Sequence, residues 1–364
     1  MPRLNLKHRM ENKNKMFLVS NMYPSKEHIR YGIFVKNFER AVENDFLIEK
    51  CVLTKRTNFL SKLFGYFKLY LKIIILVFKV KKGDVIYVHF PLHLAPVLCC
   101  VRFFCKNMVL NFHGSDLVYK STFTKFLSRF QNALIKNCFL VVPSNYYKHK
   151  IINSYGVHNN KVYVYPSGGI DTSVFYPNRK DSNERFLIGF VSNFIQGKGW
   201  DLLLTAIASI VKKNSIKNLQ LIMVGEGPDR LKIYERLDKI NINHNIISSM
   251  SQEDLAEIYN SMSLFVFPTY REEESLGLVG LESMACGTPV IAGKVGGPMG
   301  YIDDGINSFL FKKRDSNDLE RKIMSYYNLS DKEKERIKIN GINTAKLYDS
   351  KLVNKELLSF LKEL

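Results

Sequence analysis

Short apolar runs of strand length alternate along this 364-residue chain with longer stretches in which apolar residues recur at helical spacing. This alternation is typical of parallel βαβ units, because two parallel strands need a crossover that returns the chain to the same edge of the sheet. In an open parallel sheet, ligands bind at the carboxyl ends of the strands. We therefore predict an α/β protein with strands at residues 16–20, 84–89, 108–112, 139–142 and 161–165, and then at 186–191, 219–224, 264–267 and 289–292.

Two domains are expected from the length of the chain and from a turn-rich stretch near its middle. A single hydrophobic core normally stops growing at about 250–300 residues. Hydrophobic residues make up 46% of the chain, which supports packed cores. Residues 166–177 are rich in turn formers and residues 178–184 are polar, so we expect domains at 1–177 and 178–345. Residues 315–364 are expected to be helical.

The segment 264–292 places candidate ligand-binding groups directly after a strand. A polar loop follows the strand, and a helix begins near Gly277. The free N–H groups of a helix start attract anionic oxygens, and glycine allows a ligand to approach the backbone closely. Glu274 in the loop and Glu282 in the helix could reach different ends of one ligand, where carboxylates suit sugar or ribose hydroxyls. The alternative is a solvated acidic loop at 272–274, with Glu282 exposed on the helix.

Residues 264–311 resemble the donor-binding motif of family 4 GT-B glycosyltransferases. The matching elements are Pro268-Thr269, Glu274, Leu276-Gly277, the run from Glu282 to Ala292, and Gly296-Gly297. The resemblance implies two Rossmann-like domains that face a central cleft, with residues 346–364 forming a helix that returns to the first domain. It also implies a binding site for a nucleotide-diphosphate sugar at Glu274, Ser275, Leu276, Gly277, Leu278 and Glu282.

A second strand, loop and helix at 190–206 resembles the family's Gly-Arg-x-x-x-x-Lys-Gly segment. Lys198 stands at the helix entry, where a flexible ammonium group suits a diphosphate. Ser192 and Asn193 occupy the positions of the usual Gly and Arg, so one positive charge is missing from the donor site. Either another cation such as Arg271 replaces it, or donor binding and turnover are weaker than in the family.

Three further turns at strand ends resemble family features. Gly225 lies in the turn 224–228, which resembles the turn below the nucleotide base, although Gly-x-Gly alone is usually structural. His113 opens a His-Gly-x-Asp turn, in which the family's His approaches the donor sugar; a lone His at a strand end is more often structural. Gly32 lies in the first loop, where the resemblance implies contact between a backbone N–H group and phosphate.

The net charge of +19 is concentrated in the first half of the chain. Residues 1–177 contain 27 Lys and Arg against 9 Asp and Glu, whereas residues 178–364 contain 26 against 25. In residues 59–82, bulky apolar residues are interleaved with lysines, and the longest uncharged stretch is far below the roughly 20 residues of a spanning helix. We expect this helix to lie on an anionic membrane surface, the alternative being a core helix with solvated lysines.

Several other classes of protein are not expected. No recognition motif accompanies the basic residues, so nucleic acid is not expected as a partner. The polar residues 1–15 lack the apolar stretch of a signal peptide, which predicts a cytoplasmic protein, peripheral on the inner face of the cell membrane. The six cysteines have no paired CxxC spacing and are expected to be buried thiols, with neither disulfides nor zinc.

The combined prediction is a retaining glycosyltransferase of the hexosyltransferase type. It would move a sugar from a nucleotide-diphosphate sugar to a hydroxyl of a glycan or lipid-linked glycan acceptor in surface polysaccharide biosynthesis. By the resemblance, His113, Lys198 and Glu274 are the catalytic candidates, and the leaving diphosphate takes the acceptor proton. No cofactor or metal is expected, because no Asp-x-Asp run occurs in the right place and Asp303-Asp304 belongs to a turn. The alternatives are an inactive GT-B partner subunit and a GT-B sugar-nucleotide epimerase.

Overall fold

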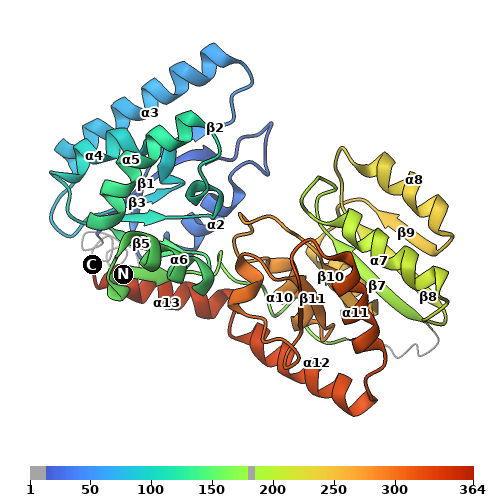
Figure 1. Ribbon diagram of the computed structural model, residues 1–364. Coiled ribbons are helices and arrows are strands. Elements are labelled where there is room, and N and C mark those ends of the chain that lie inside the picture. Colours follow the sequence, from blue (N-terminus) through green and yellow to red (C-terminus); the bar gives the residue numbers. More distant parts are fainter. Residues whose placement is uncertain (1–13, 179–184) are drawn as a thin grey trace, which may run out of the picture. The chain divides into compact units, whose positions relative to one another are not determined.

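The computed structural model describes residues 14–178 and 185–364. They form two compact units: an N-terminal unit, which runs to Gly168 and also includes Val353–Leu364, and a C-terminal unit, Gly169–Leu352 (Figure 1). Each unit contains one six-stranded sheet in which every strand pair is parallel. The predicted α/β class is therefore confirmed.

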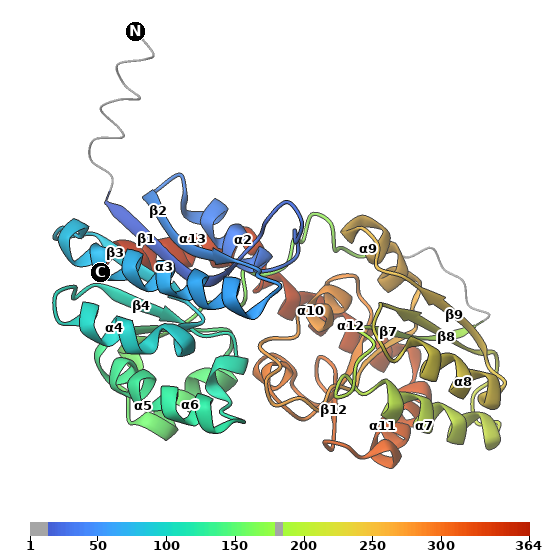
Figure 2. The ribbon, with the colours of Figure 1, turned by 90° about the horizontal axis from the view of Figure 1, so that it is seen from above.

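The sheet of the N-terminal unit has the order β2-β1-β3-β4-β5-β6. Its strands are β1 (Lys15–Tyr23), β2 (Leu47–Thr54), β3 (Val85–His89), β4 (Met108–Asn111), β5 (Phe139–Val142) and β6 (Val162–Val164). One face of the sheet packs against α3 (Phe59–Lys79), α4 (Ala95–Arg102), α5 (Thr122–Asn137) and α6 (Asn145–Tyr155). The other face packs against α2 (Ile33–Val42) and α13 (Ser350–Lys362), so that α3 and α13 lie on opposite sides (Figures 1 and 2).

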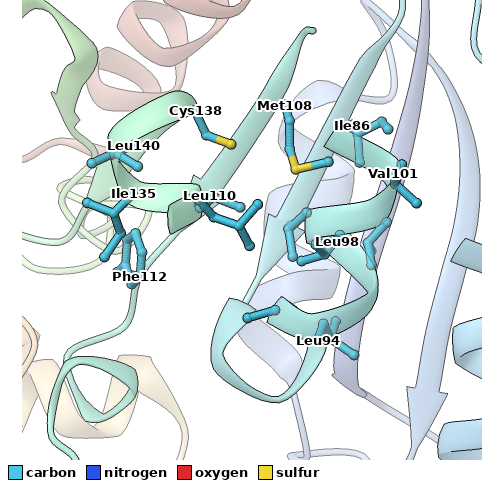
Figure 3. Close-up of a cluster of buried hydrophobic side chains, with 14 of the residues drawn as sticks. Ile86, Leu94, Leu98, Val101, Met108, Leu110, Phe112, Ile135, Cys138 and Leu140 are labelled. Atoms are coloured by element: carbon cyan, nitrogen blue, oxygen red, sulfur yellow. The ribbon is translucent and has the colours of Figure 1, made fainter. Parts of the chain in front are cut away.

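Burial of apolar side chains between the strands and the first group of helices builds the larger core of this unit. Figure 3 shows Leu98 and Val101 of α4 beside Ile86 of β3 and Met108 of β4. All four side chains are fully excluded from solvent. Burying an aliphatic side chain of this size stabilises the fold by about 1.5–3 kcal/mol, so these contacts hold the strand ends rigidly.

The sheet of the C-terminal unit has the order β12-β11-β10-β7-β8-β9. Its strands are β7 (Phe186–Val191), β8 (Leu219–Val224), β9 (Asn243–Ile247), β10 (Leu264–Phe267), β11 (Val290–Gly293) and β12 (Phe309–Phe311). Its helices are α7 (Trp200–Lys212), α8 (Arg230–Ile240), α9 (Gln252–Ser261), α10 (Leu278–Ala285), α11 (Ser316–Tyr327) and α12 (Asp331–Lys346). Residues of α7, α8 and α11 fill one core, and residues of α9 and α10 fill the other.

Three strands that the sequence patterns did not reveal are β2, β9 and β12. All three lie at an edge of a sheet; most residues of β2 and β9 are at least partly exposed, and β12 has only three residues. A continuous apolar run is typical of a parallel strand that is buried on both faces, and an edge strand lacks that burial. The predicted strands all occur, although their bounds differ by a few residues.

The chain passes between the two units after Gly168 and again after Leu352, whereas the sequence boundaries were placed after residues 177 and 345. Residues 169–177 belong to the C-terminal unit because the N–H group of Ile170 donates to Tyr348 and Phe175 is buried in that core. From Val353 onward the chain packs in the N-terminal unit, where the Tyr165 hydroxyl donates to Asn354 at 2.7 Å.

Two predictions from composition can be compared with the structure. Among the described residues, no helix has both the length and the hydropathy needed to cross a membrane. All six cysteines are free thiols, and four are buried. The expectation that every thiol is buried is wrong for Cys100, which lies near the end of α4 and is exposed to solvent.

Candidate functional site

The candidate site of the C-terminal unit lies where its strand order changes direction. β7 and β10 are neighbours in the sheet although β8 and β9 separate them in sequence. The connections from these two strands lead in opposite directions, and this is the place at which open α/β sheets generally bind ligands. The loop 192–199 follows β7 and the loop 268–277 follows β10. The two loops are joined by hydrogen bonds from the Tyr270 N–H and the Thr269 hydroxyl to the carbonyl of Gly197.

Lys198 and Glu274 meet at this junction. Nζ of Lys198 lies 2.7 Å from Oε2 of Glu274, and 17% and 12% of the two side chains is exposed. The Thr269 hydroxyl oxygen also lies 3.2 Å from the same carboxylate oxygen. The structure thus brings together two site residues that were predicted from separate motifs 76 positions apart. A half-buried ammonium and carboxylate with their edges towards solvent can bind a diphosphate and a hydroxyl side by side.

The helix start at Gly277 is closely packed. Gly277 precedes α10 with φ of 81°, and a Cβ atom there would lie 2.6 Å from the Phe267 ring. The Gly296-Gly297 turn covers the backbone before the helix, since the N–H group of Gly297 donates to the Glu274 carbonyl at 2.9 Å. Between them, Leu276 is buried, whereas Ser275 and Leu278 are partly exposed. The N–H groups of this helix start form a backbone site that suits anionic oxygens.

Glu282 lies inside α10 with its carboxyl group surrounded by protein. The hydroxyl of Tyr259, a fully buried residue of α9, donates to Oε2 at 3.2 Å. Burial raises the pKa of the carboxyl from its ordinary value to about 7, and the hydrogen bond from Tyr259 partly opposes that shift. The alternative of an exposed helix residue is therefore wrong for Glu282. The other part of that alternative, a solvated acidic loop, describes Glu272, which is exposed and forms an ion pair with Lys313.

The position that lacks the usual arginine is at the surface of the unit. Asn193 is exposed. Arg271, the candidate substitute cation, packs its stem against Gly197, where a Cβ atom would lie 2.8 Å from Cγ of Arg271. Gly225 packs equally closely against the carbonyl of Ser192, so the turn after β8 lies beside the loop after β7. Gly197, against which the Arg271 side chain packs, directly precedes Lys198 in the chain.

The N-terminal unit has its own cluster of polar groups at strand ends. His113 follows β4, and its N–H group donates to both carboxylate oxygens of Asp116, at 3.0 and 3.2 Å. Its ring stacks on Phe90 with centroids 4.5 Å apart and lies 4.5 Å from the ring of Phe34. Burial lowers the pKa of His113 to about 3, so the ring is neutral at physiological pH.

Gly32 lies in the same region of this unit, because Phe34 belongs to the helix that Gly32 precedes. Gly32 has φ of 73°, and a Cβ atom there would lie 2.7 Å from the backbone of Met22. This close approach requires glycine and places the start of α2 next to the carboxyl end of β1. Its N–H groups are therefore presented at the edge of the sheet that also holds His113.

One further residue of this cluster, His89, was not predicted. Its Nδ1 lies 3.0 Å from Nε2 of His113. The only sequence signal was its place at the end of the predicted strand 84–89, next to the strand that precedes His113.

The structure gives no metal site among the residues that it describes. Within residues 14–178 and 185–364, no group of three or more His, Cys, Asp or Glu side chains is placed to hold an ion. Asp304 forms an ion pair with Lys322 at 2.9 Å, and the N–H group of Asp303 is bonded to Asn307. The Asp303-Asp304 pair therefore has the turn location that the sequence indicated.

The second half of the chain matches a protein-family model. Residues 175–344 match the family model described as "Glycosyl transferases group 1". An uncharacterized glycosyltransferase of Methanocaldococcus jannaschii is 29% identical over 63% of this chain and 62% of its own length. The capsular polysaccharide biosynthesis glycosyltransferase CapM of Staphylococcus aureus is 29% identical over 62% of each chain. This chain thus spans about three fifths of the length of both relatives.

Solved structures with the same fold cover nearly the whole chain. Alr3699/HepE of Anabaena, determined in complex with UDP, superimposes with a TM-score of 0.73 over 96% of this chain and 100% of its own, at 17% identity. A glycosyltransferase from Rickettsia africae gives a TM-score of 0.74 over 97% of this chain and 98% of its own, at 18% identity. At these identities the comparison establishes the shared two-domain architecture.

Proposed function

We propose that this chain, whose residues 175–344 match the model of the group 1 glycosyl transferases and whose fold is GT-B, is a retaining glycosyltransferase of the hexosyltransferase type. It moves a sugar from a nucleotide-diphosphate sugar to a hydroxyl of a glycan or lipid-linked glycan acceptor in surface polysaccharide biosynthesis. The observation that carries the proposal is the Lys198–Glu274 pair at the switch point of the C-terminal sheet. The role of CapM in capsular polysaccharide biosynthesis and the UDP bound to HepE support it.

The reaction assigns a role to each side chain of this pair. The bond between the sugar's anomeric carbon and the diphosphate oxygen breaks, and the acceptor oxygen bonds to that carbon on the same face. The acceptor proton passes to the departing diphosphate. Lys198 and the N–H groups after Gly277 stabilise the charge that develops on the diphosphate. Glu274 and Glu282 accept hydrogen bonds from sugar and ribose hydroxyls, and no metal or cofactor takes part.

Thermal shift in the presence of UDP, GDP, ADP, TDP and CDP tests the donor site. A ligand at 100 times its dissociation constant adds about 2.7 kcal/mol to the free energy of unfolding. We expect one of these nucleotides to raise the midpoint of thermal unfolding of the wild type. The same nucleotide should raise the midpoints of Lys198→Met and Glu282→Ala less. Lys213→Met, which breaks an exposed ion pair with Glu320 beyond the other end of α7, is the matched control.

Product analysis separates the alternatives. A glycosylated acceptor supports the proposed reaction, whereas an isomerised donor would identify a sugar-nucleotide epimerase. The absence of a thermal response to all five nucleotides, together with no turnover, would favour the inactive partner subunit and would make Asn193 the first residue to replace.

We also propose that the N-terminal unit contacts an anionic membrane from the cytoplasmic side. The outward face of α3 exposes nine large apolar side chains, among them Phe59 at 78% and Phe78 at 86% exposure. Four lysines and no acidic residue accompany them on the helix. Phe103 and Phe104, which follow α4, are also strongly exposed. Lys79, at the end of the helix, pairs with Glu49 of β2. An apolar face on a helix that carries lysines and no acidic residue is complementary to a bilayer with anionic headgroups.

Cosedimentation with lipid vesicles tests this surface. The protein should bind vesicles that contain anionic lipid, bind zwitterionic vesicles weakly, and dissociate at high salt. Replacing Phe64 and Phe67 by serine should abolish binding without changing the thermal midpoint, because both side chains are 58% exposed. Equal binding by the double variant would contradict the proposed surface.

A further inference from the structure

His89 lies directly behind His113 in the N-terminal unit, and no sequence motif points to it. It is the last residue of β3, and 1% of it is exposed. The register of the sheet pairs His89 with Asn111, two residues before His113, which brings the two histidines together from neighbouring strands. The 3.0 Å contact between Nδ1 of His89 and Nε2 of His113 is a hydrogen bond in which one ring donates and the other accepts.

The side-chain amide of Asn111 is compatible with His89 as the acceptor. Its Nδ2 lies 3.0 Å from the Tyr87 hydroxyl and 3.3 Å from Nδ1 of His89. The one in-plane lone pair of Nδ1 then accepts from the closer group, the His113 ring at 3.0 Å. In this tautomer His113 carries its proton on Nε2, and its Nδ1 has a free lone pair.

Both rings are neutral in this arrangement. Burial lowers the pKa of His113 to about 3, and burial together with the neighbouring His113 lowers the pKa of His89 well below its ordinary value. The second nitrogen of His89, Nε2, is buried and has no hydrogen-bond partner among the described residues. An unpaired buried polar group destabilises the folded state, so packing alone does not explain a histidine at this position.

Two phenylalanines hold the His113 ring in a fixed plane. The Phe90 ring is stacked on it at an angle of 11°, and Phe34 contacts it at a tilt of 50°. The backbone of Phe90 has φ of 55°, in the left-handed region that a bulky residue rarely adopts. Backbone strain tends to persist at functional sites, where a side chain must be held in one orientation.

We propose that His89 is a positioning residue that holds His113 in the Nε2–H tautomer, so that Nδ1 of His113 accepts a hydrogen bond from a hydroxyl of a sugar substrate. The sugar in this statement rests on the proposed function, whereas the tautomer rests on the geometry of the N-terminal unit alone. The two parts can therefore be tested separately.

Nitrogen-15 NMR of the histidine-labelled full chain measures the tautomer directly, with the His113 signals assigned from a His113→Gln variant. We expect the Nε2–H tautomer in the wild type and in His89→Asn, whose amide oxygen can replace Nδ1 as the acceptor. His89→Leu removes the acceptor and should give a mixture of tautomers. A wild-type His113 in the Nδ1–H form would overturn the proposal.

Kinetics with the sugar nucleotide identified by the thermal shift test the consequence for the reaction. His89→Leu should lower kcat/KM by about tenfold, which corresponds to the loss of about one hydrogen bond. Affinity for the free nucleotide diphosphate should not change, and His89→Asn should recover most of the activity. Equal loss in both variants, in parallel with the thermal midpoint, would show a purely structural role and overturn the proposal. The predicted tautomer without turnover of any sugar nucleotide would instead refute the proposed function and the sugar hydroxyl as the ligand.

Discussion

Replacing Glu282 by glutamine should stabilise the C-terminal unit at neutral to alkaline pH and change its stability little at acid pH. Burial raises the pKa of this carboxyl from 4.5 to about 7 in the folded protein, and the Tyr259 hydroxyl donates to Oε2. One pKa unit corresponds to about 1.4 kcal/mol, so a shift of roughly 2.5 units corresponds to about 3 kcal/mol. Glutamine has nearly the same shape as the protonated acid and can still accept the hydrogen bond from Tyr259.

The sign of the effect follows from proton binding. Between pH 4.5 and about 7 the carboxyl is protonated in the folded state and ionised in the unfolded state. The free energy of unfolding therefore falls as pH rises through this interval. The contribution of the bound proton is complete below pH 4.5 and is lost above about pH 7. The free energy of unfolding of Glu282→Gln, measured relative to that of the wild type, should thus rise by about 3 kcal/mol from pH 4.5 to above about pH 7.

Thermal unfolding of both proteins at about pH 4.5 and pH 8 measures this gain. For a unit of this size, about 3 kcal/mol corresponds to a shift of roughly 6–12 °C in Tm. Burial also raises the pKa of Asp116 to about 7 and lowers that of His113 to about 3. Asp116 and His113 change the pH dependence of the free energy of unfolding in opposite directions. Both contributions are the same in the wild type and in Glu282→Gln, so they cancel when the two proteins are compared. A difference in Tm that does not depend on pH would refute the burial of the Glu282 carboxyl.

Three further predictions use the same assays. Asn193→Arg should tighten nucleotide-diphosphate binding, because it adds a positive charge to the loop of Lys198; unchanged or weaker affinity in a titration would count against it. Gly277→Ala should cost about 3 kcal/mol, because its Cβ atom would meet the Phe267 ring, whereas Gly305→Ala has a similar φ but open space and should cost only about 1 kcal/mol. If the two variants lost the same free energy of unfolding, backbone strain alone would account for the cost of Gly277→Ala, without a contribution from the Phe267 ring. Treatment with EDTA should leave turnover unchanged, and a loss that Mg²⁺ or Mn²⁺ restores would refute metal independence.

The sequence predicts the interior of both sheets better than their edges. Runs such as 139–142 and 264–267 are buried on both faces and consist only of apolar residues, so hydrophobicity alone identifies them. In β2 a charged pair, Glu49-Lys50, interrupts the apolar residues, and β9 begins with three polar residues, because only part of each strand is covered. The local pattern therefore resembles a polar loop, and only pairing with a neighbouring strand reveals the edge.

The candidate site shows the same division between local and non-local information. Gly277 and Lys198 stand in short segments whose spacing and turn residues already indicate a helix start, so motifs were sufficient to find them. The 2.7 Å contact between Lys198 and Glu274 depends on the strand order, in which β10 lies beside β7. The role inferred for His89 depends on the register between β3 and β4, which no local pattern encodes.

The packing of α13 has a consequence for synthesis on the ribosome. Val353, Leu357 and Leu361 are buried in a core of the N-terminal unit, next to residues of β1 and β3. Domains generally fold as units while the chain is still being made. Residues 169–352 include a complete sheet with its helices. The C-terminal unit is therefore fully synthesised before α13, the last helix of the N-terminal unit, has been made. The unit whose synthesis begins first is therefore the last to obtain its full core, and its nascent form exposes the apolar groove that α13 later fills.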